Sequence, residues 1–162
     1  MFEKSISDYL QKHGYPHLQL KAALFDMDGV LFNSMPYHAD AWHKVMERHG
    51  LHLSREEAYL HEGSTGASTI NIVYQRQFGK DASPELIESI YAEKSKEFNS
   101  HPEPERMPGA WETLQKVKAA GITPVLVTGS GQHSLLDRLT HNFPGMFDRS
   151  HMVTALSLIH IS

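Results

Sequence analysis

Two aspartates at the end of a short apolar segment constrain this sequence more than any other feature. Residues 22–25 are all apolar and show no helical spacing, and Asp26-Met27-Asp28-Gly29 follows them directly. A continuous apolar run of this length is typical of a strand buried on both faces of a parallel sheet. Ligands of such sheets bind beyond the carboxyl ends of the strands. The sequence therefore predicts a functional site at Asp26 and Asp28.

The spacing of the two acids predicts a cation at this site. Side chains two residues apart in an extended chain point the same way, and two adjacent carboxylates repel each other unless a cation or a shared proton intervenes. Mg²⁺ prefers oxygen ligands of this kind. We therefore expect Asp26 and Asp28 to bind Mg²⁺, although on these residues alone an ordinary Asp-x-Asp-Gly turn is an equal alternative.

A second apolar segment, residues 122–127, also ends in a polar loop, Thr128-Gly129-Ser130. A threonine hydroxyl and successive backbone amides in such a loop bind anions such as phosphate, whereas an ordinary strand-to-helix turn is the simpler reading of this loop alone. A third short strand is expected at 152–154. Strands that alternate with helices predict an α/β fold with a doubly wound parallel sheet.

Between these strands lies a region with helical patterns and no expected strand. Ser54 with Glu57 forms a capping box, and Ser83-Pro84 is a helix start. The proline-rich residues 101–109 resemble a linker. We therefore expect an all-helical cap domain at 36–106, inserted into an α/β core formed by residues 1–35 and 107–155.

Composition narrows the classes of function. The chain of 162 residues has 15 Lys+Arg, 19 Asp+Glu and no Cys, which excludes a disulfide framework, a thiolate nucleophile and a cysteine-ligated metal. The mild acidity offers no basic footprint for nucleic acid, and no apolar run reaches the roughly 18 residues of a membrane span. We expect a soluble, cytoplasmic protein with neither a nucleic-acid nor a membrane partner, acting on a small molecule.

Taken together, residues 26–34 and 125–130 resemble the two motifs of the haloacid dehalogenase-like hydrolase superfamily, in its branch with a helical cap. The resemblance implies that Asp26 is the nucleophile, that Asp28 is the general acid and base, and that Thr128 contacts the transferring phosphoryl group. Gly129 and Ser130 belong to the same phosphate-binding loop. It further implies Mg²⁺ held by Asp26, by the backbone carbonyl of Asp28 and by a later acidic residue.

Within that branch the chain resembles the β-phosphoglucomutase-like phosphatases. A second aspartate, Asp28, favours phosphoryl transfer over dehalogenation, and His38 follows the first motif at the spacing of that group. The mutases of the group grip a second phosphate with an arginine in the first cap loop, but here residues 63–68 contain none; the nearest are Arg55 and Arg76. The resemblance thus implies a Mg²⁺-dependent phosphatase of a small phosphorylated metabolite such as a sugar phosphate.

Several alternatives stay open at this stage. A phosphosugar mutase is the enzyme alternative, and a chain that only binds a phosphorylated ligand is the alternative from another class. Lys94, on the last cap helix, is a candidate cation for the substrate, although a solvated surface lysine is the simpler reading. Among the histidines, His38 is the one we expect to contact the substrate.

The resemblance ends near residue 155. The family supplies a lysine and an acidic pair after the third strand, whereas residues 156–162 contain neither a lysine nor an acid. We interpret 156–162 as a non-native tail on a C-terminally truncated chain with little activity of its own; a natural short C-terminus is the alternative. Without further strands, the strand at 22–25 is expected to form an uncovered edge of an incomplete sheet.

Overall fold

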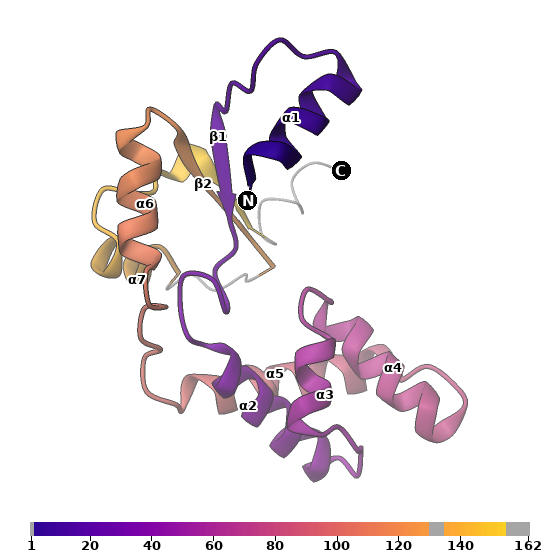
Figure 1. Ribbon diagram of the computed structural model, residues 1–162. Helices are drawn as coiled ribbons and strands as arrows, with labels where there is room; N and C mark the ends of the chain where they lie inside the picture. Colours follow the sequence, from indigo (N-terminus) through magenta and orange to yellow (C-terminus); the bar gives the residue numbers. More distant parts are fainter. Residues whose placement is uncertain (1, 130–134, 155–162) are drawn as a thin grey trace.

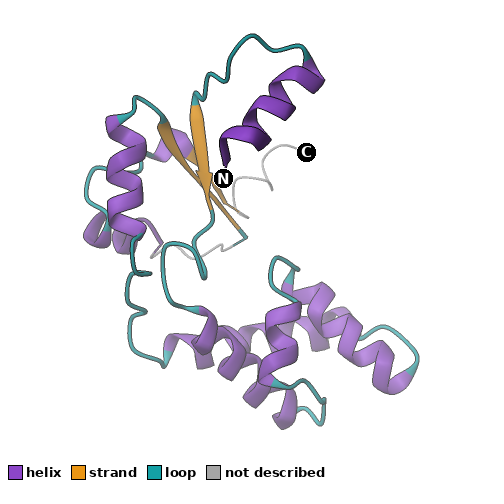
Figure 2. Ribbon diagram, in the orientation of Figure 1, coloured by secondary structure: helices purple, strands orange, loops and turns teal. Residues whose placement is uncertain are grey.

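The computed structural model describes residues 2–129 and 135–154 (Figures 1 and 2). In chain order its elements are α1 (Phe2–His13), β1 (Ala22–Phe25), α2 (Met35–Arg48), α3 (Arg55–Leu60), α4 (Gly66–Phe78), α5 (Pro84–Asn99), α6 (Ala110–Ala119), β2 (Thr123–Thr128), α7 (Leu135–Asn142), a 3₁₀ turn (Arg149–His151) and β3 (Met152–Thr154). The three strands and the helical stretch between β1 and β2 lie where the sequence patterns predict them.

The sheet is parallel, in the order β1-β2-β3. β1 pairs with β2 in the register Phe25↔Leu126, and β2 pairs with β3 in the register Thr128↔Thr154. Because the chain passes through helices between successive parallel strands, the predicted α/β class is confirmed.

The prediction that residues 22–25 are buried on both faces is wrong. Leu24 is 69% exposed and Ala22 is exposed as well, and α1 has no buried residue that could cover them. Among the described strands β1 pairs with β2 alone, so its other side is an open edge, as the incomplete sheet implies. An apolar strand is buried only where other strands and helices pack against it, and among the described strands only β2 lies beside β1.

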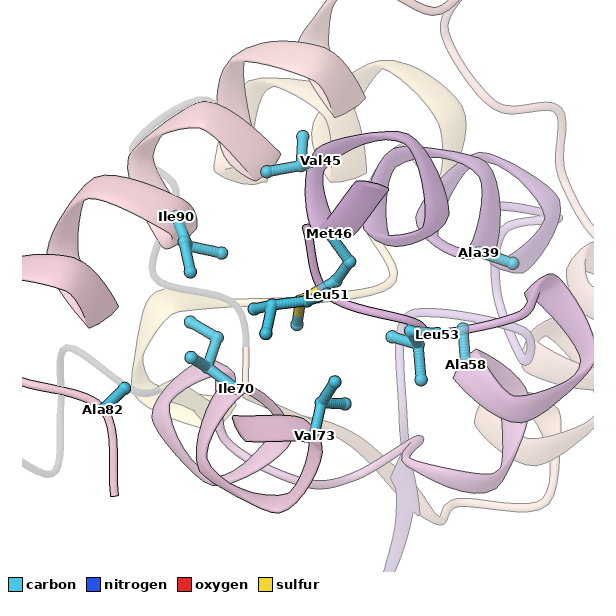
Figure 3. Packing of buried hydrophobic residues seen from close by; sticks show 10 residues of the cluster. All are labelled: Ala39, Val45, Met46, Leu51, Leu53, Ala58, Ile70, Val73, Ala82 and Ile90. Atoms are coloured by element: carbon cyan, nitrogen blue, oxygen red, sulfur yellow. The ribbon is translucent and has the colours of Figure 1, made fainter. Parts of the chain in front are cut away.

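Helices α2 to α5 pack around a hydrophobic cluster of their own (Figure 3). Their ends follow the predicted signals, since Ser54 Oγ accepts a hydrogen bond from the Glu57 amide at 3.0 Å and Ser83 Oγ accepts one from the Leu86 amide at 3.3 Å. The buried members of this cluster are Ala39, Val45, Met46, Leu51, Leu53, Ala58, Ile70, Val73, Ala82 and Ile90.

A second cluster lies under the sheet and includes the loop after β1. Its buried members are Met27, Leu31, Phe32, Ala110, Leu114, Leu126, Leu139 and Phe143. The two chain segments that join this cluster to the helical stretch run side by side: the Asn33 amide donates to the Glu105 carbonyl at 2.8 Å, and the Met107 amide donates to the Leu31 carbonyl at 2.9 Å. The chain therefore enters and leaves the helical stretch at one place.

Two predictions fall outside the described residues. Ser130 and the suspected tail at 156–162 are among the positions that the structure does not describe. Across the described residues, no helix combines the length and the apolar character needed to cross a membrane.

Candidate active site

Asp26 and Thr128 lie at the same edge of the sheet. Phe25 pairs with Leu126, so Asp26 follows one residue beyond that pair on β1 and Thr128 two residues beyond it on β2. Thr128 is only 6% exposed. In Figure 1 this edge, the carboxyl end of β1, points toward the side where α2 to α5 lie. The sheet thus presents the predicted site to the helices.

The residue between the two acids fixes their direction. Met27 is 3% exposed and belongs to the cluster under the sheet, whereas Asp26 is exposed and Asp28 half-buried. Because neighbouring side chains alternate in an extended chain, burying Met27 turns both carboxylates away from the core. Gly29, with a φ of +75°, then reverses the chain, and its amide donates to the Phe32 carbonyl at 2.8 Å.

Asp26 Oδ1 accepts a hydrogen bond from the Met27 amide at 2.7 Å. Partial burial raises the pKa of Asp26, the Met27 hydrogen bond opposes this, and the neighbouring negative charge of Asp28 raises the pKa further. A carboxylate in this state gains from a nearby cation, because the cation would relieve both the desolvation and the repulsion.

Asp28 is held by two side chains from the start of α2. Ser34 Oγ donates to Asp28 Oδ1 at 2.6 Å, and His38 Nε2 lies 3.2 Å from the same oxygen. Burial by itself would raise the pKa of Asp28, but the hydrogen bonds from His38 and Ser34, with the positive charge of Lys94, outweigh burial and hold the pKa below its usual range. Asp28 is therefore an oriented, ionised carboxylate.

Lys94 reaches this site from α5 and contacts His38. Its Nζ lies 2.7 Å from His38 Nδ1 and 5.3 Å from the ring centroids of both Trp42 and Phe98. Lys94 is only 7% exposed, so the reading of a solvated surface lysine is wrong. Burial lowers its pKa to about 8, and the negative charge of Asp28 opposes this only in part.

The contact with Lys94 determines which ring nitrogen of His38 carries a hydrogen. A protonated lysine can only donate, so His38 Nδ1 accepts from Lys94 and Nε2 carries the hydrogen that faces Asp28. The His38 ring also stacks on Phe98, with centroids 4.1 Å apart. Lys94, His38 and Asp28 thus form one chain of polar contacts from α5 to the loop after β1.

The remaining predicted loop is described in part. Gly129 is exposed, and a Cβ placed there would meet no atom of residues 2–129 and 135–154 within 4 Å. Ser130 lies outside the described residues. The exposed backbone of Gly129, next to Thr128, is accessible to an anion as far as the described residues are concerned.

The described residues also contain one group of three possible metal ligands, and it is not the predicted one. Asp40, Glu97 and His101 bring their ligand atoms within 4.8 Å of one another. Lys44 lies 2.6 Å from Asp40, Arg55 lies 2.6 Å from Asp40, and Arg48 lies 2.6 Å from Glu97. Because cationic side chains already neutralise both acids, we interpret this group as an ion-pair network that joins α2, α3 and α5.

Sequence reasoning missed the role of Ser34. It stands at the N-cap position of α2, where its hydroxyl would ordinarily accept a backbone hydrogen bond. Within the described residues it makes no such cap; it is 0% exposed and bonds to Asp28 instead. A serine just before a helix that begins with proline is the usual pattern of an N-cap. The sequence therefore does not show that the Ser34 hydroxyl binds Asp28 rather than the backbone of its own helix.

Comparison with known proteins agrees with this geometry. The family model for the haloacid dehalogenase-like hydrolases matches residues 20–159. The chain belongs to this family. The match spans both segments that carry the resemblance, residues 26–34 and 125–130, so the predicted family is confirmed.

Among solved structures, this haloacid dehalogenase-like chain resembles one from Bacteroides vulgatus that is provisionally named a β-phosphoglucomutase. The two are 61% identical with a TM-score of 0.90, and the match covers 96% of this chain and 63% of the other. Among curated proteins it is 28% identical to a phosphorylated carbohydrates phosphatase of Thermotoga maritima, over 74% of this chain and 55% of the relative.

It is also 27% identical to hexitol phosphatase A of Escherichia coli, over 85% of this chain and 61% of the relative. The chain therefore spans between half and two thirds of the length of these relatives.

Proposed function

We propose that this protein hydrolyses the phosphate ester of a small carbohydrate through an aspartyl phosphate on Asp26. One observation carries the proposal: Asp26 is exposed at the sheet edge that also carries Thr128, while Asp28 beside it is oriented by Ser34 and His38. One carboxylate is free to attack and the other is held to exchange protons. The names of the two curated relatives support the substrate class.

The reaction proceeds in two displacements. In the first, an Asp26 oxygen bonds to phosphorus, the ester P–O bond breaks, and the leaving oxygen takes a proton from Asp28. In the second, the Asp28 carboxylate takes a proton from water, whose oxygen attacks the phosphorus on Asp26. The P–O bond to Asp26 then breaks, inorganic phosphate leaves, and Asp26 is regenerated.

The contact chain at Asp28 would supply the proton for the first displacement. His38 Nε2 donates toward Asp28, and Lys94 donates toward His38 Nδ1. His38 passes its Nε2 proton to Asp28 and takes a proton from Lys94 at Nδ1. Lys94 is left neutral, and this state is accessible because the pKa of Lys94 is about 8. His38 and Lys94 would therefore act on the proton of Asp28, in place of the direct substrate contacts expected from the sequence.

Binding of the phosphoryl group falls to the loop after β2. We assign its contacts to Thr128, Gly129 and Ser130, because Thr128 lies at the edge shared with Asp26 and Gly129 is exposed beside it. Hydroxyl and amide donors of such a loop stabilise charge on the transferring group.

The residues present fit a Mg²⁺ ion. Asp26 is a carboxylate whose pKa is raised by burial and by Asp28, which a bound cation would reverse. Ser34 and His38 both bind Oδ1 of Asp28, and the family resemblance assigns the backbone carbonyl of Asp28, rather than its side chain, as the second ligand. Mg²⁺ bound there supplies positive charge that offsets the phosphate and both carboxylates.

We propose that α2 to α5, within residues 36–106, serve as a cap on this site. His38 and Lys94 come from α2 and α5, so the helical stretch completes the environment of Asp28. The adjacent connections at Asn33 and Met107 give this stretch a natural hinge. A cap that closes over bound substrate excludes water from the first displacement.

A phosphosugar mutase is the second candidate, favoured by the name of the Bacteroides vulgatus relative. Hydrolysis is favoured by the charges of the cap. Arg55 pairs with Asp40, and Arg76 pairs with Glu57, so neither of the arginines nearest to the first cap loop is available for a second phosphate. Release of free phosphate, rather than an isomeric sugar phosphate, identifies the hydrolase.

The test uses the full product of the gene that encodes this chain. We expect Mg²⁺-dependent release of phosphate from hexitol and hexose phosphates, lost upon chelation of Mg²⁺ and reduced at least about a thousandfold in Asp26→Asn. Asp81→Asn, at an exposed position before α5, is the matched control. Full activity in Asp26→Asn would refute the mechanism. Binding of vanadate with no turnover of any ester would identify a protein that only binds phosphorylated ligands.

A further inference from the structure

The loop between α3 and α4 places a carboxylate against the candidate active site. A Cβ built on Gly29 would lie 3.3 Å from Glu62 Oε1, so the Glu62 carboxylate lies beside the backbone that follows Asp28. Glu62 is exposed, and among the residues that the structure describes its side chain has no hydrogen-bond or ion-pair partner. An unpaired acceptor thus lies beside the loop that carries Asp28.

Contacts at both ends hold this loop in place. The Ser64 amide donates to the His61 carbonyl at 3.0 Å, and Thr65 Oγ1 accepts from the Ser68 amide at 3.2 Å. Gly66, at the start of α4, packs so closely on the Tyr91 ring that any Cβ there would overlap it. The loop that carries Glu62 is therefore set against α5 and oriented by local hydrogen bonds.

The charge around the loop determines what it can recognise. Three cations of the helical stretch are already paired: Lys94 with His38, Arg55 with Asp40 and Arg76 with Glu57. A free carboxylate accepts hydrogen bonds from hydroxyl groups strongly, and it repels a second phosphate or a carboxylate on the same substrate. The loop therefore favours a neutral, hydroxyl-rich tail.

We propose that Glu62 is a specificity-determining residue that selects monophosphates of sugars or polyols by accepting hydrogen bonds from their hydroxyl groups and rejects esters with a second anion. The inference rests on the proposed function, because it places the phosphate of the substrate at Asp26. It narrows the substrate class within that function and assigns the selection to a residue outside both sequence motifs.

The test compares three substrates in Glu62→Gln and in the wild-type protein: sorbitol 6-phosphate, fructose 1,6-bisphosphate and p-nitrophenyl phosphate. We expect kcat/KM for sorbitol 6-phosphate to fall about tenfold, mainly through KM, because a charged acceptor is lost. The value for p-nitrophenyl phosphate, which has no such hydroxyls, should change less than about twofold. The ratio of bisphosphate to monophosphate turnover should rise about tenfold, and further in Glu62→Lys.

The p-nitrophenyl phosphate reaction shows that each variant folds. Glu88→Gln, an exposed glutamate on α5, is the matched control and should leave all three rates unchanged. Equal changes for all substrates in Glu62→Gln, or none, would overturn the role of Glu62 and leave the phosphatase intact. A wild-type protein that hydrolyses no ester in Mg²⁺ would overturn the proposed function, and the role of Glu62 with it.

Discussion

Lys94 is a buried cation whose removal should stabilise the fold. It is 7% exposed, and burial lowers its pKa from 10.5 to about 8. At 1.36 kcal/mol per pKa unit, keeping Lys94 protonated at pH 7 costs the folded state roughly 3 kcal/mol. Replacing it with methionine keeps the packing on Trp42 and Phe98 and loses the hydrogen bond to His38, worth about 1 kcal/mol. We expect Lys94→Met to gain about 2 kcal/mol.

The pH dependence of this difference identifies its cause. The pKa of Lys94 is lower in the folded state than in the unfolded one, so between pH 8 and 10.5 the unfolded chain binds more protons. The stability of the wild-type protein should therefore rise with pH across that window relative to Lys94→Met. Because the gain comes from discharging Lys94, the advantage of the variant should vanish by about pH 10.5.

The assay is urea unfolding at pH 7, 9 and 10.5, followed by tryptophan fluorescence. Lys96→Met, an exposed lysine on the same helix, is the control and should change stability by less than about 0.5 kcal/mol. The same Lys94→Met protein should lose most of its phosphatase activity, since Asp28 loses its proton source. A variant less stable than wild type at pH 7, or a difference that does not depend on pH, would refute the reasoning.

Two further changes test the site and the helical stretch. Ser34→Ala removes the donor to Asp28 Oδ1 and leaves a cavity at a 0%-exposed position, so we expect a loss of about 1–2 kcal/mol in the free energy of unfolding. The pKa of Asp28 should rise, which shifts the acid limb of the pH–rate profile to higher pH. An acid limb that does not move would show that Ser34 does not act on Asp28. Ser54→Ala removes the cap of α3 and should cost about 1 kcal/mol in urea unfolding without altering catalysis; reduced kcat there would instead connect α3 to the reaction.

Local sequence patterns were sufficient to predict the helices and strands and the positions of the two motif loops. Apolar runs followed by glycine-rich turns predicted β1 and β2, and helix caps such as Ser54 and Ser83 predicted the starts of α3 and α5. These signals depend on neighbours within about four residues, where backbone sterics and cap hydrogen bonds dominate. The buried character of β1 was predicted wrongly, because burial is a property of what packs against a strand.

The sequence by itself determined that Asp26 and Asp28 follow a strand, that a threonine loop follows another, and that helices intervene. Only the tertiary structure decided that Ser34 serves Asp28 rather than its own helix, that Lys94 is buried against His38, and that Glu62 lies over Gly29. The last two contacts join residues dozens of positions apart in the chain. Long-range contacts of this kind depend on how whole helices pack, and packing leaves no periodic signal at a single position.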